Sequence, residues 1–364
     1  MFYFNPQIGQ FLLPYLLVLL IALLPSHANA AQAYLLFDSQ VHSETIPIKD
    51  AINDGKGNRF KRGERQWAWS WLELGLQHQH WGISLLTRYD FDLRFSKDTA
   101  ELYWLSTNKI GLPTDHQYQI ALTANAINAS GLRIMTSRAL GKAVHYKVGL
   151  SLLKAHYLLD GNSTGLASIN SESDYDLDLA VNYHYSEDSL FDRKAAQPQG
   201  KGFAIDASFD YQITPTAAVS VQVRDLLAGI YWNQSPYTLG RANTDRKEYD
   251  ENGYVKIKPT LSGFEGTDKQ YRQRLKARWH ARFNHRYKSS LGSVLQYRYQ
   301  YGRNLFGFGA AFYKGESEFS LSYWPLHRAL EVSGQHHKLR LSLTADQLSS
   351  SELRSLWLNT AYAY

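Results

Sequence analysis

Charged residues at every second position are the part of this sequence that could do chemistry. The clearest example lies between Tyr271 and Phe283, where apolar and basic side chains alternate. Residues two apart in a β-strand share one face, so the pattern predicts a basic wall. The basic set consists of Arg272, Arg274, Lys276, Arg278 and Arg282, with Arg298 on a later segment.

Acidic residues show similar spacing elsewhere, as Asp176 with Asp178 and as Asp206 with Asp210. If the basic and acidic sets line a water-filled pore, they create a transverse electric field that selects solutes by charge. The surplus of basic groups then predicts a modest preference for anions. The alternative is that these charges pair with one another and fill a narrow, closed interior.

Enzymatic chemistry finds no support in the sequence. The patterns GxSxG and HExxH and the P-loop are absent. A run that begins at Glu248 resembles a calcium loop, but its twelfth position is Pro259 instead of the required Glu. Four histidines at expected strand ends suit solvated positions better than a metal site; they are His78, His80, His336 and His337. We therefore expect no catalytic residue, no metal, no cofactor and no enzyme.

The segment from Trp81 to Phe95 indicates the type of secondary structure that carries these charged side chains. Its odd positions are mainly apolar or aromatic, whereas its even positions include Arg88, Asp90 and Asp92. This period of two indicates a β-strand with one apolar and one polar face. Globular strands usually have about 5–6 residues, and a strand that crosses a membrane needs about 9–11. The length therefore favours a strand in a lipid bilayer.

Similar alternation recurs through most of the remaining chain and predicts an all-β protein. We expect a transmembrane antiparallel β-barrel of about 14 strands, within a range of about 12–16, because bacterial barrels use even numbers. Within it, 99–105 is expected to be a returning strand, 128–131 a turn and 160–174 a loop. The segment 233–268 lacks alternation and is rich in Gly, Asn and charges, so we expect a long loop or plug.

The N-terminus has the features of an export signal. Residues 1–30 contain no charged side chain, and the apolar run from Phe11 to Leu24 precedes Ala28-Asn29-Ala30, a small-x-small cleavage pattern. We expect a signal peptide over 1–30, an N-terminal segment with a first strand and a loop over 31–66, and the barrel over 67–364. Retention of the apolar run as an anchor is the alternative. Cysteine is absent, so no disulfide holds the fold together.

The end of the chain resembles outer-membrane β-barrel proteins of Gram-negative bacteria, whose last strand alternates and ends in an aromatic residue. The residues that carry this resemblance are Leu356, Leu358, Tyr362 and Tyr364. The resemblance implies insertion into the outer membrane and recognition of the last strand by the barrel-assembly machinery. It identifies the porin-like class and no individual family.

These observations together predict a pore or binding channel for small polar, and in part anionic, solutes. The alternative is a non-transporting barrel with an assembly, adhesion or structural role at the cell surface. The expected partners are outer-membrane lipid, the barrel-assembly machinery and small polar solutes. The net charge of +6 could suggest nucleic acid, but we discount this because the basic residues lie on a strand face of an exported chain.

Overall fold

The computed structural model describes residues 31–171, 174–188, 197–244, 247–249, 255–257 and 260–363. The expected signal peptide over 1–30 and the terminal Tyr364 lie outside these ranges.

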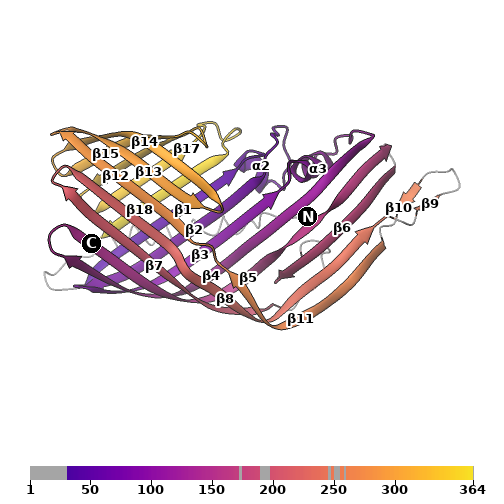
Figure 1. Ribbon diagram of the computed structural model, residues 1–364, viewed down its shortest axis with the longest axis horizontal. Coiled ribbons are helices and arrows are strands. Elements are labelled where there is room, and N and C mark those ends of the chain that lie inside the picture. Colours follow the sequence, from indigo (N-terminus) through magenta and orange to yellow (C-terminus); the bar gives the residue numbers. More distant parts are fainter. Residues whose placement is uncertain are drawn as a thin grey trace.

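The described chain forms one closed antiparallel β-barrel of 14 strands (Figure 1). β1 pairs with β2 on one side and with β18 on the other, and this last pairing closes the cylinder. The first half of the barrel contains β1 (Gln32–Ser43), β2 (Arg65–His78), β3 (Trp81–Phe95), β4 (His116–Leu140), β5 (Val144–Ser171), β6 (Asp174–Tyr185), β7 (Gln199–Thr214) and β8 (Ala217–Asn243). The second half contains β11 (Thr260–Arg274), β12 (Arg278–Lys288), β13 (Leu291–Gln300), β14 (Arg303–Lys314), β15 (Ser317–Trp324), β16 (Ala329–His336), β17 (Leu339–Ala345) and β18 (Ser355–Ala363).

Two positions in the barrel wall are each occupied by two consecutive strands. β6 and then β7 both pair with β5 and with β8, at different levels of these long strands. β11 and then β12 likewise pair with successive parts of β8. The strand count of 14 predicted from the sequence is therefore confirmed, because each broken pair counts as one strand of the wall.

The two ends of the barrel differ. At the turn end, connections are as short as two residues, as between β2 and β3 or between β14 and β15. At the loop end, longer connections contain the helices α2 (Ile48–Ile52) and α3 (Lys97–Thr107), which lie along the upper rim in Figure 1. Outer-membrane barrels place short turns in the periplasm and longer loops outside the cell, so the loop end is the extracellular end.

The outer surface is apolar along the strands that form the barrel. Trp81, Ile83 and Leu85 of β3 are 60%, 49% and 67% exposed. Phe306 and Phe308 of β14 are similarly exposed. Large apolar side chains in such a continuous band are suited to contact with lipid. Among the described residues, no helix has both the length and the apolar character needed to cross a membrane.

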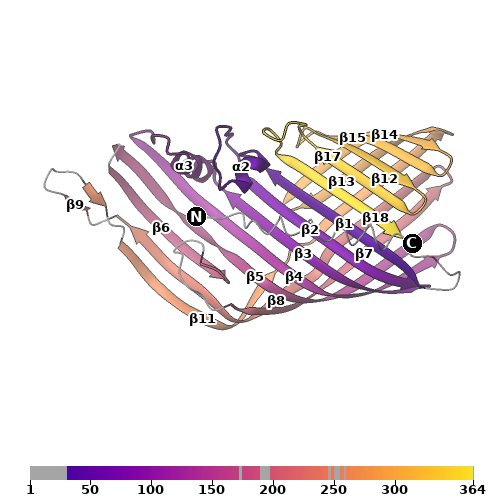
Figure 2. The same ribbon diagram turned by 180° about the vertical axis from the view of Figure 1, so that it is seen from behind.

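The extracellular end continues into a sheet that projects far beyond the rest of the barrel, seen from both sides in Figures 1 and 2. β4 and β5 contain 25 and 28 residues, well above the roughly 9–11 needed to cross a membrane. The projecting sheet consists of the outer parts of β4, β5, β6, β8 and β11, with the hairpin of β9 (Lys247–Tyr249) and β10 (Val255–Ile257) near its tip.

The segment 233–268 is therefore neither a loop nor a plug along most of its length. Residues 233–243 belong to β8 and residues 260–268 belong to β11, and these two strands pair with each other. Their side chains do not alternate in polarity. We attribute this to their position beyond the membrane, where no lipid requires one face to be apolar.

Three further sequence predictions were wrong. Residues 99–105 lie in α3, whose N-cap Ser96 accepts a hydrogen bond from the Thr99 backbone N–H. The expected turn at 128–131 lies within β4, beside a register shift at which His156 of β5 has no partner in the ladder. Most of the expected loop at 160–174 belongs to β5. There Gly161 permits close approach to β6, because an added Cβ would lie 2.3 Å from that of Tyr183.

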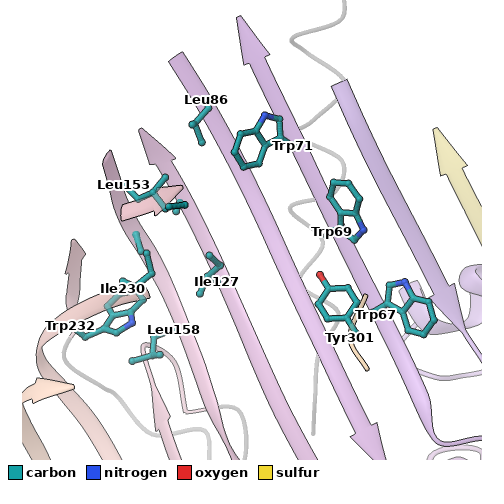
Figure 3. Packing of buried hydrophobic residues seen from close by; sticks show 13 residues of the cluster. Trp67, Trp69, Trp71, Leu86, Ile127, Leu153, Leu158, Ile230, Trp232 and Tyr301 are labelled. Atoms are coloured by element: carbon teal, nitrogen blue, oxygen red, sulfur yellow. The ribbon is translucent and has the colours of Figure 1, made fainter. Parts of the chain in front are cut away.

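The inner surface carries the largest buried cluster (Figure 3). Trp67, Trp69 and Trp71 of β2 point inward, and Ile230 and Trp232 of β8 belong to the same cluster. Inward-facing charged residues lie among these aromatic rings. The barrel interior is thus packed with side chains at this level.

Candidate functional site

The centre of the barrel contains two arginines and two aspartates in direct contact. Arg88 on β3 binds Asp225 on β8 through two parallel hydrogen bonds of 2.6 and 2.8 Å. Arg278, the first residue of β12, contacts Asp90 at 2.6 Å and Asp225 at 3.0 Å. Arg88 also donates to Asp90 at 2.8 Å. We call these four residues the central charge network.

Aromatic rings and a further ion pair surround the network. The Arg278 guanidinium lies 4.4 Å from the centre of the Trp69 ring. Arg224 lies 5.1 Å from the rings of both Trp69 and Trp71, and it pairs with Asp38 at 3.2 Å. The tryptophans that the sequence places on alternate positions of β2 therefore form an inner wall against which guanidinium groups stack.

The central charge network joins opposite parts of the barrel wall. β3 pairs with neither β8 nor β12 in the sheet, so the bonds from Arg88 to Asp225 and from Arg278 to Asp90 cross the interior. All four residues are at most 7% exposed. The network therefore spans the interior at this level, and its charges pair with one another, as the alternative interpretation of the charge pattern expects.

The structure brings only some of the ten predicted pore-lining residues to this region. Arg278 belongs to the network, and Asp206 lies beside it, with a carboxylate oxygen 3.4 Å from the Arg133 guanidinium. Lys276 is 3.5 Å from Asp92, nearer the extracellular end. Each of these groups is paired.

Arg272 and Arg274 lie on the outer face, which corrects the expectation of one continuous basic row. Tyr271 and Gln273 on the same strand face inward and hydrogen-bond to other inward-facing side chains. Residues next to them in a strand point the opposite way, and Arg272 accordingly lies over the outward-facing ring of Tyr231. The three residues between β11 and β12 shift the alternation by one position.

The remaining acidic residues of the predicted set are far from the network. Asp178 lies on the projecting sheet, where it pairs with Arg241, and both side chains are at least half exposed. Asp176 accepts a hydrogen bond of 2.7 Å from Asn170 on the same sheet. Asp210 is exposed on β7 near the turn end. The predicted acidic wall is therefore divided among three regions.

Two further predicted residues take part in separate contacts within the second half of the barrel. Arg282 pairs with Glu318 at 2.6 Å. Arg298 lies over the ring of Trp324 and is 4.0 Å from Glu331. Glu331 is 2% exposed and accepts a hydrogen bond from the Trp324 indole N–H. Charge pairing thus extends through the interior on both sides of the central network.

The sequence reasoning missed Asp225, which contacts both arginines of the network. Arg88 and Asp90 carry a clear signal, since they occupy the polar face of the strand from Trp81 to Phe95. Asp225 has no such signal. It lies beside an irregularity in the β7–β8 pairing and has a positive φ of 57°. The alternation of the flanking residues therefore does not predict which way the Asp225 side chain points.

The last strand, β18, carries three of the four residues of the predicted assembly signal within the described chain. Leu356 and Leu358 lie on the opposite face of β18 from the buried Trp357. Tyr362 pairs with Leu35 of β1 at the closure, whereas Tyr364 lies outside the described residues. Recognition of this strand by the barrel-assembly machinery remains an expectation.

Buried aromatic and imidazole rings lie at the extracellular mouth. His42 contacts Trp67 and His327, with ring centres 4.2 and 4.1 Å apart. Trp357 lies 5.4 Å from His327. His327 belongs to the turn between β15 and β16, and burial, together with the positive charge of Arg303, lowers its pKa to about 4.

This low pKa predicts an acid-sensitive barrel. The unfolded chain binds a proton at His327 below pH 6.5 or so, whereas the folded barrel binds it only near pH 4. Stability should therefore fall by about 3 kcal/mol as the pH falls through this window. His327→Gln should remove that part of the pH dependence of urea unfolding, whereas His145→Gln at the turn end should retain it. Equal profiles for His327→Gln and the unaltered chain would contradict this assignment.

Among the described residues, no group of three or more His, Asp or Glu side chains is arranged to hold a metal ion. The site is thus built from ion pairs, guanidinium–aromatic contacts and hydrogen bonds. Such groups can bind, orient or exclude solutes.

A closed antiparallel barrel with an apolar exterior and a charged interior defines an outer-membrane β-barrel protein, located in the outer membrane of Gram-negative bacteria. The chain belongs to the family described as "Family of unknown function (DUF5723)", which matches residues 27–335. No curated protein matches this chain in sequence.

Solved structures with a similar arrangement include two transporters. The Pseudomonas putida toluene transporter TodX is 9% identical, with 94% of this chain and 89% of that chain covered and a TM-score of 0.41. The Ralstonia pickettii toluene transporter TbuX is 11% identical, with 93% and 89% covered and a TM-score of 0.38. A Pseudomonas aeruginosa FadL homologue is 9% identical, with 92% and 88% covered and a TM-score of 0.29.

Proposed function

We propose that this barrel is a solute channel of the outer membrane and that the central charge network is its closed gate. The observation that carries the proposal is the set of buried ion pairs between β3, β8 and β12, which cross the interior. A gate of this kind opens when opposite walls separate and water hydrates the freed charges. Each arginine and aspartate is then stable in either state, as an ion pair or as a hydrated group.

The choice of residues supports a gate over a permanent filling. Ion pairs taken out of water lose much of their Coulomb energy to desolvation, and apolar residues of similar size often fill a core equally well. A barrel that needed only a solid interior would therefore gain little from four buried charges. Charged groups are useful where an interior alternates between dry and hydrated states.

We propose that the transported molecules are small polar solutes, with a preference for anions. Above the network, the guanidinium groups of Arg65 and Arg94 both lie within 4 Å of the space beside Gly302. Arg303 directly follows Gly302, although Glu44 contacts its guanidinium at 2.7 Å. This basic group adjoins the interior on the extracellular side, where it raises the local concentration of anions.

Single-channel recording in a planar bilayer tests the gate. Because Arg278→Ser alone would leave Asp90 and Asp225 with Arg88 as their one remaining partner in the network, the test variant is the double substitution Arg278→Ser with Asp90→Ser. We expect the double variant to show a several-fold higher open probability or conductance than the unaltered chain. Arg274→Ser is the matched control, since Arg274 lies on the outer face, and it should leave the currents unchanged.

Folding must be established for every sample, for example by heat-dependent mobility on a gel. A folded double variant that is as silent as the unaltered chain would reject the gate. If neither passes current, the projecting sheet favours the second candidate, a non-transporting barrel that binds partners or surfaces outside the cell. β4 and β5 extend this sheet well beyond the length that a membrane requires.

A further inference from the structure

A cavity of about 540 Å³ lies at the extracellular mouth, apart from the central charge network. It lies between the end of β1, the residues around Lys61, the turn at His327 and the segment that leads into β18. Its volume is within the range of about 300–1,000 Å³ that is usual for small-molecule sites. The space therefore exceeds what a bare inorganic ion would need.

The acidic side chains that line the cavity already have partners. Glu44 pairs with Arg303, and Glu352 pairs with Arg59. Asp346 accepts hydrogen bonds of 3.0 and 2.8 Å from the backbone N–H groups of residues 354 and 355. Their negative charge is thus largely compensated before any ligand enters.

Three basic side chains that line the same cavity have no such compensation. Lys61, Arg328 and Arg354 line the space, and within the described parts of the chain no carboxylate lies within 4 Å of their charged nitrogens. An excess of unpaired positive charge in a concave site favours an anion.

Buried nitrogen atoms without hydrogen-bond partners provide a second, independent observation. His42 and His327 both line the cavity and are only 6% and 7% exposed. Nε2 of His42, both ring nitrogens of His327 and Nε of Arg354 have no partner. Buried polar groups are nearly always satisfied in native structures. The Arg354 Nε–H can only donate, and a neutral His327 imidazole has one N–H and one acceptor nitrogen, so these atoms around one space indicate a missing ligand that carries hydrogen-bond acceptors.

We propose that this cavity binds a small organic anion, with its carboxylate or phosphate group held by Lys61 and Arg354 and its remaining part against the rings of His42 and His327. This inference rests on the proposed channel function in one respect, namely that the bound anion is a solute that the barrel transports. Binding itself requires no conduction, so it can be measured separately.

The test uses the full-length barrel purified in detergent and isothermal titration with benzoate, a flat carboxylate. Benzamide has nearly the same shape but no charge and serves as the ligand control. We expect benzoate to bind at least ten-fold more tightly than benzamide. The double variant Lys61→Gln with Arg354→Gln should weaken benzoate binding at least ten-fold.

The matched control is Arg138→Gln with Lys142→Gln, which removes the same two charge types from exposed positions at the turn end. It should bind benzoate like the unaltered chain. Equal binding of benzamide, equal loss in both double variants, or no benzoate binding at all would overturn the proposal. A lipid source of the anion is tested with lipopolysaccharide, and binding of that lipid in place of benzoate would also overturn it.

The two proposals fail separately. If benzoate binds as expected but no current flows, the anion site at the mouth is supported and the channel function is rejected. If currents respond to the gate substitutions but benzoate does not bind, the channel function is supported and the anion site at the mouth is rejected.

Discussion

Asp225→Asn should lower the free energy of unfolding of the barrel by about 3–5 kcal/mol. Asp225 is 2% exposed and contacts both Arg88 and Arg278. An amide has nearly the same shape as the carboxylate but carries no charge. The substitution therefore leaves two buried guanidinium groups to share the single remaining aspartate of the network. Urea unfolding in detergent or lipid, followed by tryptophan fluorescence, measures the loss.

The matched control for this prediction is Asp178→Asn on the projecting sheet. Asp178 pairs with Arg241 at 2.5 Å, but the two side chains are 50% and 62% exposed. Exposed ion pairs contribute little to stability, so this substitution should leave the urea midpoint of unfolding nearly unchanged. Similar costs for the two substitutions would mean that burial does not govern the strength of the central network.

Trp232→Ala should destabilise the barrel by about 3–5 kcal/mol, as is usual for a buried tryptophan. The Trp232 side chain is fully buried, and its indole N–H donates to Gln273 at 3.1 Å. Gln273 in turn donates to backbone carbonyls of Ala126 on β4 and Leu159 on β5. Removing the indole both creates a cavity and loosens the contact that holds the end of β11 against the opposite wall.

Trp81→Ala removes the same side chain from the outer surface, where it is 60% exposed. In detergent this substitution should cost about 1 kcal/mol or less. The difference between the two tryptophan variants isolates the contribution of interior packing. If Trp81→Ala were as costly as Trp232→Ala, the interior cluster would not be the main support of this region.

Where polar and apolar residues alternate along a segment without a break, the sequence predicted both a strand and the direction of its side chains. Lipid on one side and a charged interior on the other require alternate residues to differ, as they do from Trp81 to Phe95. Arg88 and Asp90 were for this reason identifiable as residues of the polar face. The same requirement led to the correct strand count.

Outside the membrane no lipid requires alternate residues to differ in polarity, so strands there lack the alternation by which they could be recognised in the sequence. The paired residues of β8 and β11 between 233 and 268 lie beyond the membrane, and they therefore resemble a loop. The direction of Arg272 and Arg274 could not be predicted for a related reason. The short break before β12 moves the alternation by one residue, and nothing in the residue types marks the shift.

The sequence by itself thus determined that this protein is an antiparallel barrel in a membrane, because the bilayer imposes its two-sided pattern on each strand locally. Only the tertiary structure decided that Arg88 meets Asp225 and that Arg278 meets Asp90. Those contacts depend on the curvature of the closed wall and on strand register, which bring together residues more than a hundred positions apart. The imidazole and basic groups at the mouth likewise come from distant segments and meet only when the cylinder closes.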